Sequence, residues 1–182
     1  AIMRADRALG SARLGVAVAL LTEAGTLLGS QFPASFGIGG AATTSVIASV
    51  MVPIGDWSVA AEASIGVTRP DLTGAGLVQS GARLVGTAAS VAISRAAIFA
   101  GDDRISLTIA QPLRASGWAM LATQAEAVRL GPSGREIAVE AGYARNFAGG
   151  GFSLGSFWRS QPGNIAGAAA DIGGAARLRL RF

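Results

Sequence analysis

The segment Trp57-Ser58-Val59-Ala60-Ala61-Glu62-Ala63-Ser64-Ile65-Gly66-Val67-Thr68 decides the fold class of this chain. An amphipathic helix repeats its apolar residues at intervals of three and four, whereas a half-buried strand repeats them at every second position. The apolar side chains here follow the second pattern: Trp57, Val59, Ala61, Ala63, Ile65 and Val67. The segment therefore predicts a strand with one apolar and one polar side.

The same alternation recurs along the chain between short turn signals rich in Gly, Asp and Pro. It predicts an all-β, antiparallel up-and-down sheet of about ten strands, and at most twelve. Residues 1–11 would lead into a single domain over residues 12–182, with longer loops at 70–80 and 161–170. The expected strands are 12–22, 25–33, 41–53, 56–68, 82–98, 103–113, 116–128, 135–147, 151–161 and 171–182.

Composition narrows the setting of this sheet. The 182 residues are 51% hydrophobic and 14% charged, and 26 of them are Gly. No apolar run reaches the roughly 18 residues that a membrane helix needs. Two architectures are consistent with this composition: a soluble β-sandwich or barrel, and a transmembrane barrel whose apolar half faces lipid.

The missing residue types limit the chemistry. The chain contains neither Cys nor His, so thiol nucleophiles, Ser-His triads and Cys/His metal sites are not available. We therefore expect no enzyme activity, no catalytic residues, no cofactor and no metal. The 15 basic residues are all Arg and are spread along the chain, which argues against nucleic-acid binding.

The C-terminal segment favours the membrane barrel. Its apolar positions end at Leu178, Leu180 and Phe182, and these alternate with Arg177, Arg179 and Arg181. Chain termini of soluble proteins tend to be polar and frayed, whereas a final strand that closes on Phe is usual in outer-membrane barrels. An Arg on the lipid side near the membrane midplane costs about 2–4 kcal/mol, so these arginines should line the lumen.

A charged lumen requires counter-charges. Glu62, Glu136 and Glu140 fall on the polar sides of their expected strands, and we expect them to form a lumen charge network with Arg177, Arg179 and Arg181. Lipid should contact four residues on the opposite sides: Trp57, Ile65, Ile105 and Val139.

Several short motifs carry a family resemblance that covers the chain from about residue 12 onward. They are Glu23-Ala24-Gly25-Thr26-Leu27-Leu28-Gly29-Ser30, Gly101-Asp102-Asp103-Arg104-Ile105 leading to Gln111-Pro112-Leu113-Arg114, Gly134-Arg135-Glu136-Ile137, Phe157-Trp158-Arg159 with Pro162-Gly163-Asn164-Ile165, and Asp171-Ile172-Gly173 through to Phe182. Together they resemble the C-terminal domain of subtilisin-like serine peptidase autotransporters of alphaproteobacteria.

The resemblance implies an outer-membrane translocator that anchors and exports an N-terminal passenger. The passenger would be a subtilisin-like protease, and its catalytic residues have no counterpart among these 182 positions. The expected partners are outer-membrane lipid, the barrel insertion machinery and the passenger. In such a barrel Leu178, Leu180 and Phe182 would form the C-terminal assembly signal.

The alternative is a soluble or periplasmic β-barrel or sandwich that folds or tethers an attached enzyme. One Tyr and three Trp are few aromatic residues for the interface belts of a membrane barrel, which favours this alternative. The apolar stripe from Trp57 to Val67 favours the membrane barrel, because a soluble domain would carry charge on the outer face of each strand.

Overall fold

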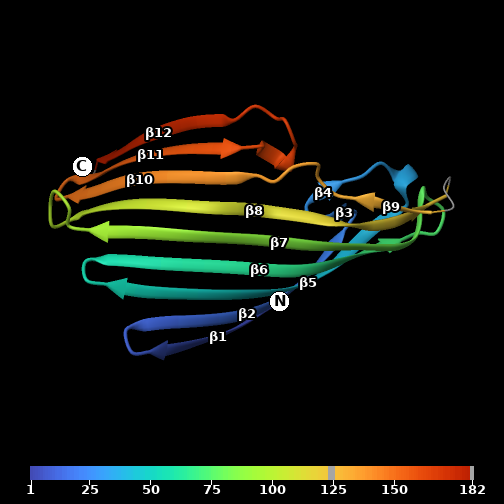
Figure 1. Ribbon diagram of the computed structural model, residues 1–182, viewed down its shortest axis with the longest axis horizontal. Coiled ribbons are helices and arrows are strands. Elements are labelled where there is room, and N and C mark those ends of the chain that lie inside the picture. Colours follow the sequence, from blue (N-terminus) through green and yellow to red (C-terminus); the bar gives the residue numbers. More distant parts are fainter. Residues whose placement is uncertain (123–125, 181–182) are drawn as a thin grey trace.

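The computed structural model describes residues 1–122 and 126–180, and Figure 1 shows them as a curved sheet of long strands. Two 3-10 turns, Ala34–Phe36 and Pro162–Asn164, are the helical elements of this part of the chain. The strands are β1 Ile2–Leu9, β2 Ala12–Ala24, β3 Thr26–Leu27, β4 Ser30–Gln31, β5 Ile38–Ile54, β6 Trp57–Leu72, β7 Val78–Ala96, β8 Asp103–Leu121, β9 Ala127–Leu130, β10 Ile137–Phe147, β11 Gly150–Ser160 and β12 Asp171–Leu180.

The main sheet confirms the all-β, antiparallel up-and-down architecture. Its order is β1-β2-β5-β6-β7-β8-β10-β11-β12, with β9 added beside β8, and every pairing is antiparallel. The ten strands that pair in this sheet, within the described residues, agree with the expected number of about ten. A separate small hairpin joins β3 to β4.

Cross-strand partners lie on the same side of a sheet, so the register defines two faces. One row of partners runs Asp6, Gly15, Ser49, Glu62, Ser90, Ala110, Ala138, Arg159, Asp171. We call this side the polar face. The next row runs Arg7, Leu14, Val50, Ala61, Val91, Ile109, Val139, Trp158, Ile172, and we call its side the apolar face.

The two ends of the sheet differ in their connections. Residues 10–11, 55–56, 97–102 and 148–149 make the short turns at one end, on the left in Figure 1. The connections 25–37, 73–77 and 161–170 and the segment 126–136 lie at the other end, and all of them except 73–77 are longer than these turns. We refer to these as the short-turn end and the loop end.

The β3–β4 hairpin caps the polar face at the loop end. Leu27, only 8% exposed, packs with Ala41 of β5 and Leu84 of β7, and Leu130 of β9 joins this cluster. In Figure 1 the hairpin crosses the ends of the central strands. Neighbouring loops are tied to it, since the amide of Leu77 donates to the carbonyl of Ser35 at 2.8 Å.

Two segments differ from expectation near the N-terminus. The segment 1–11, expected to lead into the barrel, contains β1, which pairs along its whole length with β2. The expected strand 25–33 is instead the β3–β4 hairpin followed by a 3-10 turn. Glycines at 25 and 29 with positive φ break that segment into turns, which alternation alone does not reveal.

The expected strands 103–113 and 116–128 are also wrong, because Asp103–Leu121 is one continuous strand. Pro112 lacks an amide donor and normally interrupts a ladder. Here it lies where the β7–β8 register shifts, between the pairs Ala89–Gln111 and Thr87–Arg114. A bulge tolerates the missing donor, so the strand continues through the proline.

Candidate functional site

Two hollows lie on the polar face. One of about 610 Å³ is lined from five strands, among them by Arg4, Asp6, Ser49, Glu62 and Ser90. Another of about 410 Å³ is lined by residues of β8, β10, β11 and β12, including Thr108 and Glu140. The β3–β4 hairpin also packs on this face, through Leu27 against Ala41 and Leu84, so we take the polar face as the inner side of the curved sheet.

Small side chains dominate this inner side. In the row through Glu62, five of the nine positions are Gly, Ala or Ser. Phe157 is the exception, and its ring lies over Gly173, where a Cβ would come within 2.6 Å of the ring. The inner side can therefore hold water and polar groups, with Phe157 narrowing it near β12.

The apolar face is exposed, and its middle carries no charge on β5, β6 and β7. Val46, Ile65, Val91 and Ile109 are 45%, 55%, 52% and 51% exposed. Six arginines on this face lie toward the ends of the strands: Arg7, Arg95 and Arg145 near the short turns, and Arg69, Arg83 and Arg129 near the loops. Arg114 of β8, level with Thr87, donates instead to the carbonyls of Gly134 and Pro132 at 3.0 and 3.3 Å. Such a charge-free band bounded by charge is unusual for a water-exposed surface.

Aromatic side chains gather at the edges of this band. Trp57, beside the short turn 55–56, lies under the guanidinium of Arg95, whose Cζ is 5.5 Å from the ring. Tyr143 stands edge to face with Phe99 and Phe152, at centroid distances of 6.1 and 6.3 Å. Toward the loops, Trp118 pairs in register with Arg83 on one side and Arg129 on the other.

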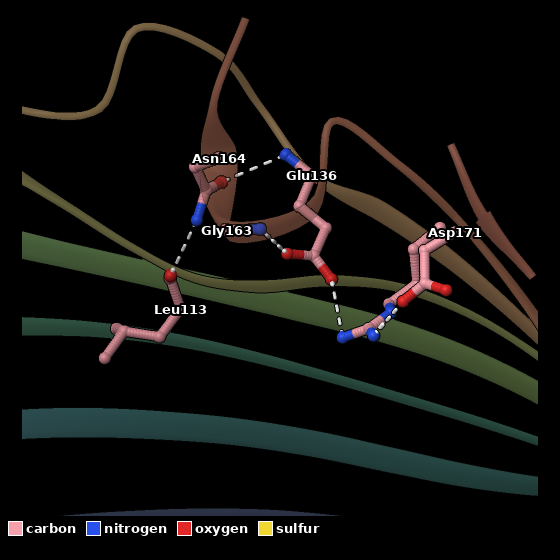
Figure 2. A network of polar contacts seen from close by, with 6 residues as sticks. Leu113, Glu136, Gly163, Asn164 and Asp171 are labelled. Atoms are coloured by element: carbon pink, nitrogen blue, oxygen red, sulfur yellow. Dashed lines mark hydrogen bonds and ion pairs between the residues drawn. The ribbon is translucent and has the colours of Figure 1, made fainter. Parts of the chain in front are cut away.

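A buried polar cluster around Glu136 fixes two loops at the loop end (Figure 2). The Glu136 carboxylate accepts the amide of Gly163 at 2.7 Å, and its Oε1 is 3.9 Å from Nη1 of Arg159. The Glu136 amide donates to Oδ1 of Asn164 at 3.0 Å, and Nδ2 of Asn164 donates to the carbonyl of Leu113 at 3.2 Å. Arg159 also pairs with Asp171. The cluster thus joins β8, β11, β12 and the 162–164 turn.

Asp103 plays the corresponding part at the short-turn end. Its carboxylate, 3% exposed as a residue, accepts the amides of Ile98, Phe99 and Ala100 at 2.7, 2.9 and 3.1 Å. It also accepts the hydroxyl of Tyr143 at 3.1 Å. One side chain therefore satisfies the backbone of the whole 97–102 turn.

Glu23 does the same for the β3–β4 hairpin. It accepts the hydroxyl of Thr26 at 3.1 Å and the amides of Leu28 and Gly29 at 2.9 and 2.6 Å. Glu23, Asp103 and Glu136 all belong to motifs that carry the family resemblance. Those motifs thus coincide with carboxylates that hold connections in place, a role that their turn context indicates but that we did not assign from the sequence.

The structure does not bring the expected lumen charge network together. Glu62 and Glu140 lie on the polar face with Arg177 and Arg179, but Glu136 precedes β10 and pairs with Arg159. Within residues 1–122 and 126–180, no ion pair joins a glutamate to Arg177 or Arg179.

The register explains the missing contact. Glu140 is level with Gly173, four residues along β12 from Arg177. That offset is about 13 Å along the strand and two strands, about 10 Å, across it. Sequence reasoning found the correct face of the sheet but could not supply the register.

The remaining expected residues are placed as follows. Trp57, Ile65, Ile105 and Val139 lie on the apolar face. Leu178 and Leu180 lie on the same face, 62% and 52% exposed. Arg181 and Phe182 lie outside the described residues.

Compared with family models, with curated proteins and with solved structures, the chain matches none. None of the helices that the structure describes is long and apolar enough to cross a membrane. In the same residues, no group of three or more acidic side chains could hold a metal ion.

Proposed function

We propose that this chain forms the wall of an outer-membrane β-barrel that anchors and helps export an N-terminal passenger. The observation that carries the proposal is the exposed apolar face, whose middle is free of charge on β5, β6 and β7 and whose edges carry arginines and aromatic rings. Lipid-facing surfaces of membrane barrels have this composition, with an apolar band between aromatic girdles.

The height of the band fits a bilayer. On β7 the outward-facing residues between Arg83 and Arg95 carry no charge, and on β6 the same holds between Trp57 and Arg69. Each interval spans twelve residues, about 40 Å along a strand. At the 35–45° tilt of barrel strands this becomes roughly 30 Å along the membrane normal, close to the hydrocarbon thickness.

The register also supports a barrel. Asp6 lies four residues before the turn at Gly10, whereas Asp171, in the same row of partners, lies nine residues before Leu180. The row therefore drifts along the strands from one edge of the sheet to the other. Closing a sheet into a barrel requires such a stagger, because the strands must tilt against the barrel axis.

The biological role rests on the family resemblance of the turn motifs. It suggests an outer-membrane location, assembly by the barrel insertion machinery, and a subtilisin-like protease as the passenger. In that setting the short turns face the periplasm and the longer loops face outward. The polar face lines the lumen, and the chain itself acts by insertion and not by catalysis.

Extraction and gel mobility test the membrane barrel directly. We expect the native protein to leave membranes only with detergent and to migrate faster on SDS gels before boiling than after it. Recovery as a freely soluble monomer with the same mobility in both samples would rule out the barrel and favour the soluble β-domain.

Fluorescence quenching tests which face meets lipid. In a Trp118→Phe, Trp158→Phe background, Trp57 is the remaining tryptophan. Lipids brominated on their acyl chains should quench it in reconstituted vesicles, and aqueous iodide should quench it much less. The opposite pattern would place the apolar face in water.

A further inference from the structure

The two edge strands of the sheet run in the same direction. β1 runs from Ile2 to Leu9 and ends at the short turn 10–11. β12 runs from Asp171 to Leu180, and Leu180 is level with Gly150, which follows the short turn 148–149. Both strands therefore point toward the short-turn end, as the first and last of nine alternating strands must.

Each edge strand has one side without a partner in the part of the chain that the structure describes. Joining β12 directly to β1 would create a parallel pair within a sheet whose other pairings are all antiparallel. Up-and-down membrane barrels of bacteria keep every pair antiparallel, which requires an even number of strands. An open edge in hydrocarbon would leave backbone amides and carbonyls without hydrogen bonds, which membrane-spanning structures avoid.

We infer that an odd number of antiparallel strands from outside residues 1–182 fills the gap between β12 and β1. The simplest case is one strand, running from the short-turn end to the loop end. This inference deepens the proposed function, on which it rests for the lipid setting. A second copy inserted in the same membrane orientation does not fit, because rotation about the barrel axis again places β12 beside β1 in the same direction.

The side chains along β12 specify the neighbouring strand. Arg177 and Arg179 lie on the polar face near the short-turn end, and in the described residues neither has a carboxylate within ion-pair distance. Leu178 and Leu180 lie on the apolar face. The partner strand should therefore carry Asp or Glu inward in its first half and apolar residues outward along its length.

The polar side of β1 does not require an acidic residue on a neighbouring strand. Its inward-facing Arg4 and Asp6 pair with each other, with Nε and Oδ2 2.8 Å apart. Among the inward-facing residues of the two edge strands, the unbalanced positive charge thus lies on β12. The acidic residues belong on the strand that adjoins β12, whether one strand or three fill the gap.

A synthetic strand can test this inference on the whole chain refolded in detergent micelles. The probe is a twelve-residue peptide that alternates Val or Leu with Ser, with Glu replacing two Ser in its N-terminal half. A matched peptide carries Gln at both Glu positions. We expect the Glu peptide to bind more tightly, roughly three- to tenfold, and Arg177→Gln with Arg179→Gln to abolish that difference.

Cross-linking then reports the direction of the bound strand. The chain has no native cysteine, so single cysteines give unambiguous products. A peptide with an N-terminal Cys should cross-link to Leu178→Cys, and one with a C-terminal Cys should cross-link to Ile172→Cys. The reverse preference, or no peptide binding, would overturn the inference.

Direct closure is a separate outcome. Disulfides between Leu178→Cys and cysteines placed at Met3, Ala5 or Leu9 in the absence of peptide would show that β12 and β1 pair with each other, and would also overturn it. Failure of the proposed function is read elsewhere, from extraction and gel mobility. A soluble chain that still binds the peptide in the antiparallel direction would lose the membrane role and keep the edge assignment.

Discussion

Charged side chains have different roles at the ends of the strands and in their middle. At the ends, Glu23 and Asp103 each accept three hydrogen bonds from their turns, and Glu136 accepts one from Gly163 and pairs with Arg159. In the middle, Glu62 and Glu140 line open hollows on the polar face, and the apolar face carries no charge on β5, β6 and β7.

This contrast separates two requirements of the same sheet. Connections between long strands contain many backbone donors that the ladder does not use, and a carboxylate can satisfy several of them at once. The middle of the sheet satisfies its own backbone, so side chains there are free to match the surroundings. We therefore expect the ends to contribute most to stability and the middle to be adapted to the surroundings of the sheet.

Charge placed in the middle of the apolar face should have the largest effect. We expect Val91→Arg to cost about 2–4 kcal/mol in bilayers and to block assembly, because Val91 lies between Ala61 and Ile109 at the centre of the band. Ile54→Arg is the matched control, since Ile54 is 59% exposed on the same face beside a short turn. Folding yield into lipid vesicles measures both.

The alternative class of protein gives a different result for this pair. On a water-exposed surface, both substitutions would be nearly neutral. Equal and small effects of Val91→Arg and Ile54→Arg would therefore contradict the membrane setting without affecting the fold.

Removal of the Asp103 carboxylate should have a smaller effect, because water can solvate part of the freed turn. Asp103→Ala leaves the amides of Ile98, Phe99 and Ala100 without their acceptor. We expect a clear loss of resistance to urea, whereas Asp102→Ala, which removes an exposed ion pair with Arg145, should change little. Equal sensitivity of the two variants would show that the turn does not depend on Asp103.

Alternation in the sequence was sufficient to predict the sheet, because side-chain period reflects strand geometry directly. It correctly placed Trp57, Ile65, Ile105 and Val139 on one face and Arg177 and Arg179 on the other. It could not predict that β8 continues through Pro112, since that depends on a bulge in the pairing with β7. Local pattern determines the faces, and pairing partners determine the strand ends.

The contacts of the candidate site likewise depend partly on local sequence and partly on long-range pairing. The polar side of Glu136 follows from its spacing to Glu140, but its bonds to Gly163 and Arg159 depend on a loop 27 residues away in sequence. The absence of contact between Glu140 and Arg177 depends on the register of two successive hairpins. Such long-range offsets leave no trace in the spacing of residues along one strand.

Glu136, in the loop before β10, and Glu140, within β10, allow the contribution of a strand end to stability to be compared with that of a strand middle. Glu136→Gln keeps an acceptor for the Gly163 amide but removes the charge beside Arg159, whose Nε already lacks a partner. We expect it to cost about 1–2 kcal/mol in urea unfolding, because the Glu136 side chain is only 8% exposed and its hydrogen bonds are charge-assisted. Glu140→Gln, four residues away on the same side, should stay within about 0.5 kcal/mol, since Glu140 is exposed and forms no ion pair among the described residues.

Asn164→Ala provides an independent check on the Glu136 cluster, because it removes the acceptor of the Glu136 amide and the donor to Leu113 without changing charge. If Glu140→Gln were as costly as Glu136→Gln, the middle of the polar face would contribute to stability as the ends do, and the contrast between them would not hold.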